Sequence, residues 1–108
     1  LFRSFENLEV GKNYLVKRIV VNKNEKLSVQ YHRNRTENWV VVSGAGRVMK
    51  GKQEISCNVG SSFFISKEEI HSLENTGKDP LVLIEIQIGD NLSEEDIVRL
   101  EDKYGRVN

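Results

Sequence analysis

The sequence has little of several things that would define its class at once. Cys57 is the one cysteine among 108 residues, so no disulfide can form within the chain. The longest uncharged apolar run, residues 81–84, is far too short to span a bilayer. The first residues also lack the basic-then-apolar order of a secretion signal. We therefore expect a protein of a reducing compartment, cytoplasmic and without a membrane partner.

Net charge is absent as well. Sixteen Lys and Arg residues balance sixteen Asp and Glu residues, which removes the usual electrostatic argument for a nucleic-acid partner. A chain of this length hides roughly two thirds of its unfolded surface on folding, enough for a core without disulfides or structural metal. We expect residues 1–108 to form a single domain.

Proline occurs once and no segment has low complexity, so the chain is expected to form short strands joined by tight turns. We predict eight strands rich in Val, Ile, Phe or Tyr, at residues 14–22, 27–31, 38–43, 47–50, 54–58, 62–66, 71–75 and 81–88. Eight strands at this spacing are typical of a β-sandwich or barrel, and a doubly wound parallel sheet is excluded by the lack of alternating helices.

The last segment changes its period. Ser93 and the acidic residues after it suit the first turn of a helix, where they meet exposed backbone N–H groups. Ile97, Leu100 and Tyr104 would then share one helical face, and Gly105 would end the helix. We predict a short carboxy-terminal helix beside the sheets.

Two histidines, His32 and His71, lie at the ends of predicted strands. In an extended segment Asn34 would face the same side as His32, and a bend before Glu37 would return its carboxylate to the same point. Imidazole and carboxylate ligands together suit Zn²⁺, Mn²⁺, Fe²⁺, Co²⁺ or Ni²⁺. Two unrelated histidines are the more frequent situation in a chain of this length, so the spacing leaves a metal site and ordinary polar residues both open.

Three stretches resemble a known family. Residues 27–44 look like the family stretch L-S-L-Q-x-H-x-H-R-x-E-H-W-V-V-V-S-G, and residues 95–106 are similar to its closing signature E-D-D-I-V-R-F-E-D-x-Y-G-R. Residues 70–77 match the second cupin motif, V-H-R-L-E-N-x-G. The chain thus resembles the cupin domain at the carboxyl end of type II phosphomannose isomerases, which are often bifunctional with an amino-terminal mannose-1-phosphate guanylyltransferase domain.

The resemblance implies a cupin double-stranded β-helix, or jelly roll, as the fold. It implies that His32, Glu37 and His71 bind a divalent metal ion such as Zn²⁺, Mn²⁺ or Co²⁺. Asn34 stands at the position of the family's second histidine, as a neutral oxygen donor. Asn38 likewise stands where the family has a histidine near the substrate, and the four residues 66–69 replace a Pro-x-Gly turn.

The family's phosphosugar contacts would fall on Arg35, Arg99 and Arg106, whose planar guanidinium groups suit phosphate oxygens. With Glu37, Arg35 and Arg99 would form the catalytic set, and Asn38 would add a substrate contact. From the residues alone, Arg99 and Arg106 are equally explained by ion pairs with neighbouring acidic residues.

By resemblance, the expected function is the interconversion of mannose 6-phosphate and fructose 6-phosphate for GDP-mannose and surface-polysaccharide biosynthesis. One alternative is a catalytically weakened cupin domain that binds sugar phosphate, or that dimerises or regulates an attached guanylyltransferase; another is a different cupin enzyme. The phosphosugar is the expected partner, together with a second copy in a homodimer. The chain is also expected to be the carboxy-terminal piece of a longer enzyme.

Overall fold

Alternating burial along the strands builds the fold of this computed structural model, which describes residues 3–93 and 95–100. In β2 (Tyr14–Val21), every second side chain from Leu15 onward is buried, as the two-residue repeat of a strand requires. One antiparallel sheet has the order β1 (Arg3–Gly11), β2, β9 (Leu81–Gly89), β4 (Arg35–Ser43) and β7 (Ser62–Ile65). The second has the order β10 (Val98–Arg99), β3 (Lys26–Tyr31), β8 (His71–Asn75), β5 (Gly46–Lys50) and β6 (Gln53–Cys57).

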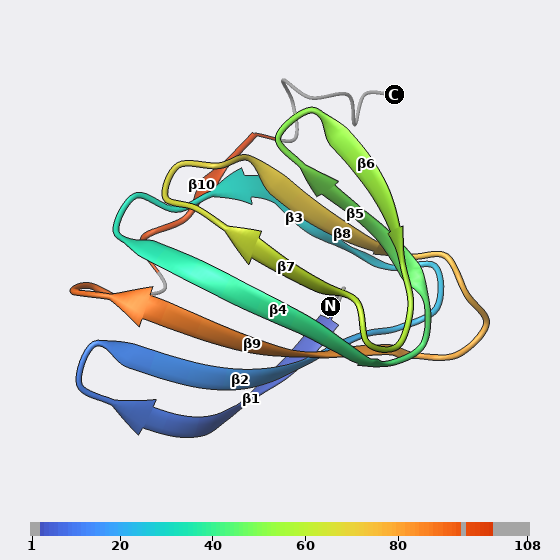
Figure 1. Ribbon diagram of the computed structural model, residues 1–108, viewed down its shortest axis with the longest axis horizontal. Helices are drawn as coiled ribbons and strands as arrows, with labels where there is room; N and C mark the ends of the chain where they lie inside the picture. The colour runs from blue at the N-terminus through green and yellow to red at the C-terminus, as the bar shows by residue number, and fades with distance from the viewer. Residues whose placement is uncertain (1–2, 94, 101–108) are drawn as a thin grey trace.

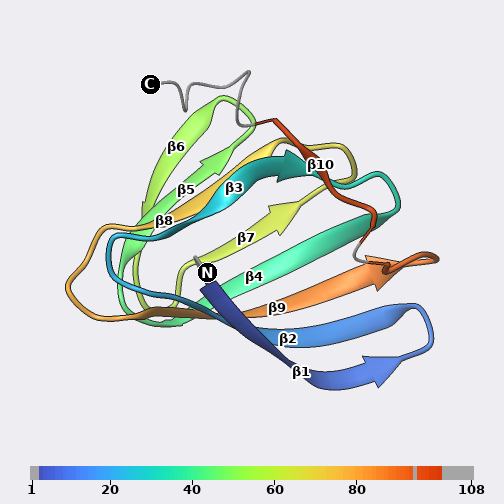
Figure 2. The ribbon, with the colours of Figure 1, turned by 180° about the vertical axis from the view of Figure 1, so that it is seen from behind.

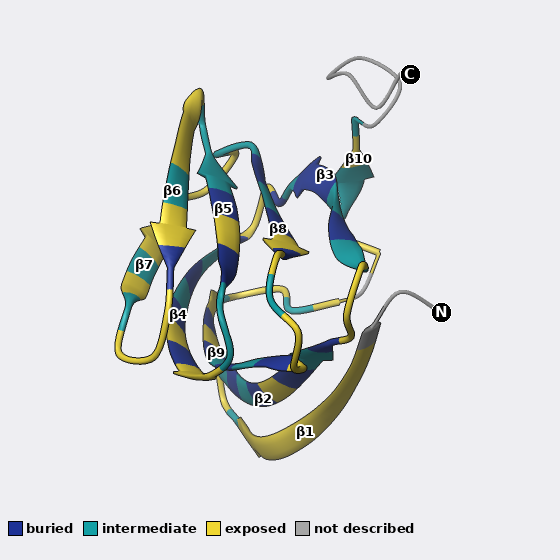
Figure 3. Cartoon of the chain, turned by 90° about the vertical axis from the view of Figure 1, so that its right-hand side faces the viewer, coloured by how far each residue is buried: buried dark blue, intermediate teal, exposed yellow. Residues whose placement is uncertain are grey.

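The two sheets face each other and enclose one apolar core (Figures 1 and 2). Figure 3 shows the resulting alternation of buried and exposed residues along β2, β4 and β9. The largest fully buried apolar side chains come from both sheets and are Val21, Trp39, Val48, Ile65, Leu73, Leu81 and Leu83. Burying each contributes about 1.5–3 kcal/mol, so this cluster supplies the main favourable term in folding. The predicted all-β jelly roll is confirmed.

Each of the eight predicted strands is present, with small shifts at its ends, and two further strands were not predicted. β1 was missed because the sequence of residues 4–10 lacks the alternation that marks a half-buried strand, and the structure shows all of these residues exposed. The strand exists because its backbone pairs with β2. β4 begins at Arg35, earlier than predicted. The prediction missed this start because the inward-facing residues there, Arg35 and Glu37, are charged and not apolar.

The predicted carboxy-terminal helix is wrong for residues 95–100, where the structure has an extended segment with β10 in place of a helix. Backbone pairing with β3 decides this: Val98 and Arg99 pair with β3, and the Leu100 N–H donates to the Val29 carbonyl at 2.8 Å. Tyr104 and Gly105 lie outside the described residues. Within the described ranges, no helix is long and apolar enough to cross a membrane.

Gly89 sets the distance between the ends of β9 and β4. It lies opposite Arg35 in the ladder, and a Cβ atom at this glycine would meet the Asn34 carbonyl oxygen at 2.2 Å. The absence of a side chain therefore lets the first residue of β4 approach closely. This close approach positions Arg35 at the mouth of the space between the sheets.

Candidate functional site

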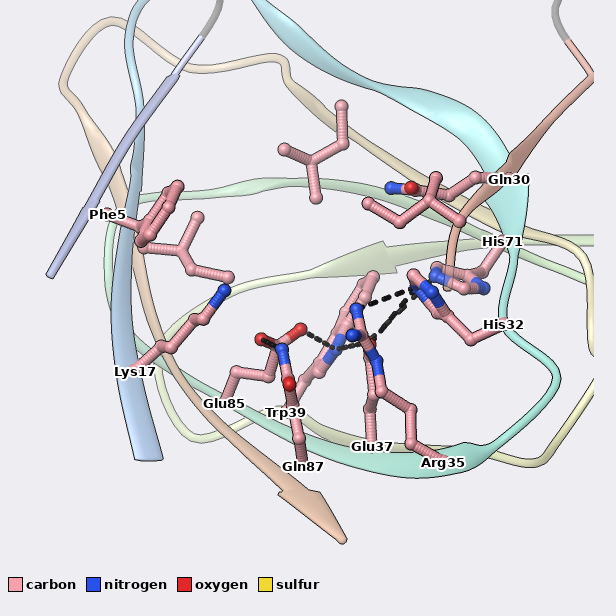
Figure 4. A pocket seen from close by; sticks show the side chains of 13 residues that line it. Phe5, Lys17, Gln30, His32, Arg35, Glu37, Trp39, His71, Glu85 and Gln87 are labelled. Atoms are coloured by element: carbon pink, nitrogen blue, oxygen red, sulfur yellow. Dashed lines mark hydrogen bonds and ion pairs between the residues drawn. The ribbon is translucent and has the colours of Figure 1, made fainter. Parts of the chain in front are cut away.

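A polar pocket interrupts the apolar core at one end of the sandwich (Figure 4). Apolar side chains such as Ile19, Leu27 and Trp39 form part of its wall, and the rest of the lining is largely polar or charged. The cavity measures about 30 Å³, room for an ion or about one or two water molecules. Polar groups concentrated in so small a buried space point to a ligand.

Three side chains that could bind a metal ion converge in this pocket. His32 follows β3, Glu37 lies in β4 and His71 opens β8, and one ligand atom from each lies within 4.8 Å of the others. Their relative exposures are 4%, 1% and 1%, so the surrounding strands hold all three away from solvent. The structure thus brings together residues that are 39 positions apart at most in the sequence.

Backbone carbonyl groups fix both imidazoles in the same tautomer. The Nδ1 atom of His32 lies 2.6 Å from the carbonyl oxygen of Asp96, and the Nδ1 atom of His71 lies 2.8 Å from that of Glu69. Because a carbonyl oxygen only accepts, each Nδ1 carries the hydrogen and each Nε2 keeps an unprotonated lone pair. Metal-binding histidines are oriented in this way by their outer-sphere partners.

The Nε2 lone pairs face a carboxylate. A cation placed between these electron-rich atoms would be attracted to all of them. His32 Nε2 lies 3.2 Å from Glu37 Oε2, and His71 Nε2 lies 3.9 Å from Glu37 Oε1. Burial, followed by the charge of Arg35, lowers the pKa of His32 to about 4, and burial also lowers the pKa of His71. Neither ring is therefore cationic near neutral pH, and the three donors fit a divalent ion such as Zn²⁺, Mn²⁺ or Co²⁺.

Arg35 supplies the positive charge at this point in the structure. Its Nε donates to Glu37 Oε2 at 2.9 Å, and its Nη2 donates to His32 Nε2 at 3.2 Å. The side chain is only 4% exposed, and its Nη1 is buried without a hydrogen-bond partner. Arg35 thus lines the pocket beside the three candidate metal ligands, while its expected role as a phosphosugar contact stays a prediction.

The turn at residues 66–69 holds both histidines from behind. The Glu68 N–H donates to the His32 carbonyl at 2.7 Å, and the Glu69 carbonyl accepts from His71. The Glu69 carboxylate in turn accepts from the Ser66 N–H and from Lys50 Nζ, each at 3.0 Å. Glu68 has φ of 63°, a left-handed conformation that favours glycine. The turn that replaces the family's Pro-x-Gly therefore performs its positioning task with some backbone strain.

Asp96 holds the segment after β3 from the other side. Its carboxylate accepts the Arg33 N–H at 3.0 Å and the Asn34 N–H at 2.9 Å, while its carbonyl accepts from His32. Burial acts to raise the pKa of Asp96, but the two backbone N–H groups outweigh it, and the pKa is lowered overall. The sequence suggested a helix start here, and the structure shows a clamp on His32.

The opposite side of the pocket has a second carboxyl group and an amide, both from β9. Glu85 accepts from Trp39 Nε1 at 3.1 Å and from Gln87 Nε2 at 2.8 Å, and the same indole N–H donates to Glu37 at 2.9 Å. Burial, and then the nearby Glu37 carboxylate, raise the pKa of Glu85 to about 8. The side-chain oxygens of Gln30 and Gln87 are buried and unpartnered. Figure 4 shows Glu85 and Gln87 across the indole from the two imidazoles.

Several predicted site residues do not line the pocket. Asn34 is exposed, and Asn38 lies on the other face of β4 from Glu37 and Trp39. Arg99 is exposed in β10, opposite the pocket residue Gln30. Arg106 lies outside the described residues. The structure therefore assembles His32, Arg35, Glu37 and His71 and leaves Asn34, Asn38 and Arg99 outside this cluster.

The pocket also contains residues that were not among the predicted site residues. Lys17 is 5% exposed, lies opposite Glu85 in the ladder and places its Nζ 4.2 Å from the Phe5 ring centroid. Gln30, Glu85 and Gln87 complete the group. The signal was the two-residue repeat: Leu81 and Leu83 mark the inward face of β9, which places Glu85 and Gln87 on the same face.

Comparison with known proteins identifies first the class and then the family. The fold matches the cupin domain of Schizosaccharomyces pombe Cnp3 with a TM-score of 0.79 and 14% identity, over 88% of this chain and 70% of that one. The protein has the cupin fold. Residues 2–102 match the family described as mannose-6-phosphate isomerase C-terminal, and the chain belongs to that family.

Curated relatives are considerably longer than this chain. Mannose-1-phosphate guanylyltransferase RfbM of Salmonella typhimurium is 49% identical over 91% of the chain and 20% of its own length. Xanthan biosynthesis protein XanB of Xanthomonas campestris is 43% identical over 96% of the chain and 22% of its own length. The chain thus spans about a fifth of each of these relatives, and the resemblance seen in the sequence is confirmed at the level of the family.

Proposed function

We propose that this chain is a metal-dependent isomerase domain that interconverts mannose 6-phosphate and fructose 6-phosphate. The observation that carries the proposal is the convergence of two unprotonated imidazole nitrogens and a carboxylate in a buried pocket with a second carboxyl group beside them. The family description names this isomerase, and the names of the relatives include mannose 1-phosphate and xanthan, consistent with sugar-nucleotide and polysaccharide biosynthesis.

His32, Glu37 and His71 would hold the metal ion. A bound divalent ion supplies Lewis-acid polarisation of the sugar's carbonyl and hydroxyl oxygens. The Asp96 and Glu69 carbonyls keep the two imidazoles oriented for this, and Trp39 keeps one Glu37 oxygen in place by hydrogen bonding. These partners are present before any ligand binds, so the cost of ordering the donors is already met by folding.

The isomerisation requires a group that moves a proton between neighbouring carbons. In the forward direction the proton leaves C2 of the aldose and returns to C1, while the hydroxyl proton of O2 passes to O1. Glu85 is the pocket carboxyl group outside the proposed ligand set, and Trp39 and Gln87 orient its two oxygens. We assign it the role of general base, because a pKa of about 8 leaves part of this carboxyl ionised near neutral pH, able to take the proton from C2 and return it to C1.

The remaining polar groups would bind the sugar phosphate. Unpartnered oxygens of Gln30 and Gln87 can accept from sugar hydroxyls, and Arg35 has an unpartnered Nη1 for a phosphate oxygen. Arg99 in β10 lies next to Gln30 in the ladder and is proposed as a second phosphate contact. The roles of Asn38 and Arg106 stay predictions. Because the cavity is only about 30 Å³, side chains at its mouth must move to admit a hexose phosphate.

The test is fructose 6-phosphate formation from mannose 6-phosphate by the metal-stripped chain, before and after addition of Zn²⁺, Mn²⁺ or Co²⁺. We expect turnover only with metal, and no turnover from Glu85→Gln with metal present. The matched control is Glu54→Gln, an exposed position in β6. Absence of turnover with every metal would refute the isomerase proposal, and an active Glu85→Gln would refute the assigned base.

A second candidate is a weakened domain that binds sugar phosphate, or that dimerises or regulates an attached guanylyltransferase. The observation in its favour is that Asn34 and Asn38, which replace family histidines, both lie away from the pocket. Saturable binding of mannose 6-phosphate without turnover would support this function. A cytoplasmic homodimer, and a single domain that belongs to a longer enzyme, are part of both proposals.

A further inference from the structure

The guanidinium of Arg35 lies on the atoms that a metal ion would need. It donates to Glu37 Oε2 through Nε at 2.9 Å and to His32 Nε2 through Nη2 at 3.2 Å. Both acceptors belong to the proposed ligand set. The arginine is buried with them, so its position is enforced by the surrounding strands and by the close approach at Gly89.

Arg35 and a metal ion would compete directly for one atom, Nε2 of His32. Because its Nδ1 hydrogen is committed to the Asp96 carbonyl, Nε2 has one lone pair and can serve either Arg35 or a metal ion. Glu37 Oε2 has a second lone pair and can keep its contact with Arg35 Nε while binding a metal. The observed contact of Nη2 with His32 and metal binding by His32 therefore exclude each other.

Arg35 is itself incompletely satisfied in its present place. Its Nη1 is buried and has no hydrogen-bond partner, which carries the desolvation cost of an unmet donor. Once His32 binds a metal, Nη2 loses its acceptor as well. With both Nη1 and Nη2 lacking acceptors in a buried pocket, the guanidinium would bind an anionic oxygen strongly.

We propose that Arg35 serves as a built-in substitute cation in the metal-free protein, and that metal binding releases its guanidinium to bind the phosphate or another anionic oxygen of the ligand. This inference rests on the proposed function, because it takes the same three residues as metal ligands. Its consequence is positive coupling: metal strengthens anion binding, and by thermodynamic reciprocity anion binding strengthens metal binding by the same factor.

The experiment titrates Co²⁺ into the metal-free chain by calorimetry and visible absorption, with and without inorganic phosphate. Arg35→Leu should bind Co²⁺ at least about tenfold more tightly than the parent chain, since both the competing hydrogen bond and the repulsive charge are gone. Phosphate should tighten Co²⁺ binding to the parent chain and have no effect on the variant. Arg33→Leu is the matched control, an exposed arginine two residues away that lies over Tyr31.

The outcomes separate this inference from the proposed function. Equal or weaker Co²⁺ binding by folded Arg35→Leu would overturn the substitution of arginine for metal while leaving the metal site intact. Failure of phosphate to change Co²⁺ affinity in the parent chain would overturn the coupling. Failure of both chains to bind Co²⁺ would refute the metal site and the inference together.

A second variant guards against loss of the fold, since removing Arg35 leaves the Glu37 carboxylate buried without its partner. Arg35→Gln keeps a hydrogen-bond donor for Glu37 and removes the charge, so it should also bind Co²⁺ more tightly than the parent. Circular dichroism establishes folding before each titration. If Arg35→Gln is folded and binds no more tightly than the parent, the inference is wrong.

Discussion

The residues of the pocket differ in how completely their polar atoms are satisfied. On the side of His32, Glu37 and His71, which we call the organised side, the Nδ1 atom of each ring is bonded to a backbone carbonyl. Gln30, next to His71 in the ladder, and Gln87, across the indole, each have a buried amide oxygen with no partner. The organised side therefore suits a ligand of fixed geometry, such as a metal ion, and the two amides retain unused acceptors for the hydroxyls of a larger ligand.

The largest expected effect comes from removing one of the proposed metal ligands from the organised side. His71→Ala should weaken Co²⁺ binding by at least about 100-fold, more than the loss typical of an outer-sphere partner. Isothermal titration gives the affinity. Glu74→Ala, an exposed change in the same strand, should leave the affinity unchanged. A His71→Ala chain that binds Co²⁺ as the parent does would show that this side holds no metal.

Acid should disturb the organised side first in the metal-free chain. The folded pKa of His32 is lowered to about 4 from the ordinary 6.5, so the unfolded chain binds more protons between these values. The contribution of His32 to the free energy of unfolding is therefore highest above pH 6.5 and falls as the pH drops toward 4, whereas the raised pKa of Glu85 acts in the opposite direction. We expect His32 to account for roughly 2–3 kcal/mol at pH 4, less than the full shift gives because the folded imidazole is only half protonated there.

Urea unfolding with chelator at pH 7, 5.5 and 4 measures this loss. His32→Gln removes the titrating group, so the variant should lose less stability than the parent over the same range. Identical pH dependence in the two chains would contradict the assignment of the acid loss to this imidazole.

The unpartnered amide oxygens offer a test in which stability and substrate affinity are expected to change in opposite directions. Gln30→Met removes a buried oxygen that has no partner in the free chain, so the free energy of unfolding should stay the same or rise slightly. The KM for mannose 6-phosphate should rise about tenfold, because a hydroxyl of the sugar loses its acceptor. Gln53→Met, an exposed change in β6, is the control. A destabilised variant with unchanged KM would mean that Gln30 is structural.

The smallest expected effect concerns the turn behind the organised side. Glu68 has a positive φ, so Glu68→Gly should raise the free energy of unfolding by about 1 kcal/mol while keeping the N–H bond to the His32 carbonyl. Thermal unfolding measures the gain. Lys67→Gly, at the neighbouring position, should not stabilise the chain. A destabilised Glu68→Gly would show that the Glu68 side chain matters more than its backbone.

The sequence predicted the fold well where burial alternates and poorly where backbone pairing alone decides. The eight predicted strands have apolar side chains on one face, and all are present in the structure. β1 is exposed along residues 4–10, and β10 forms because residues 98–100 pair with β3, so neither leaves a pattern in its own side chains. The same pairing explains why the acidic start at Ser93 did not become a helix within the described residues.

For the site, the sequence predicted the residues that converge and misjudged one orientation. His32, Glu37 and His71 were found through the resemblance, and the structure brings them together. Asn34 was expected to share a face with His32 because strands repeat every two residues. The strand ends at Tyr31 and the next begins at Arg35, so the repeat is interrupted by a turn and Arg35 takes the inward position. Loop geometry of this kind depends on Asp96, which is distant in sequence.

The bond between His32 and Asp96 also bears on the order in which the protein is made. The two residues are 64 positions apart, and the carbonyl that fixes the imidazole belongs to a segment near the carboxyl end of this chain. During synthesis most of the sandwich strands leave the ribosome before residue 96 does. Until then His32 has no partner for Nδ1 and its ring is free to rotate. The proposed metal site is consequently complete only after the segment around residue 96 has packed against His32.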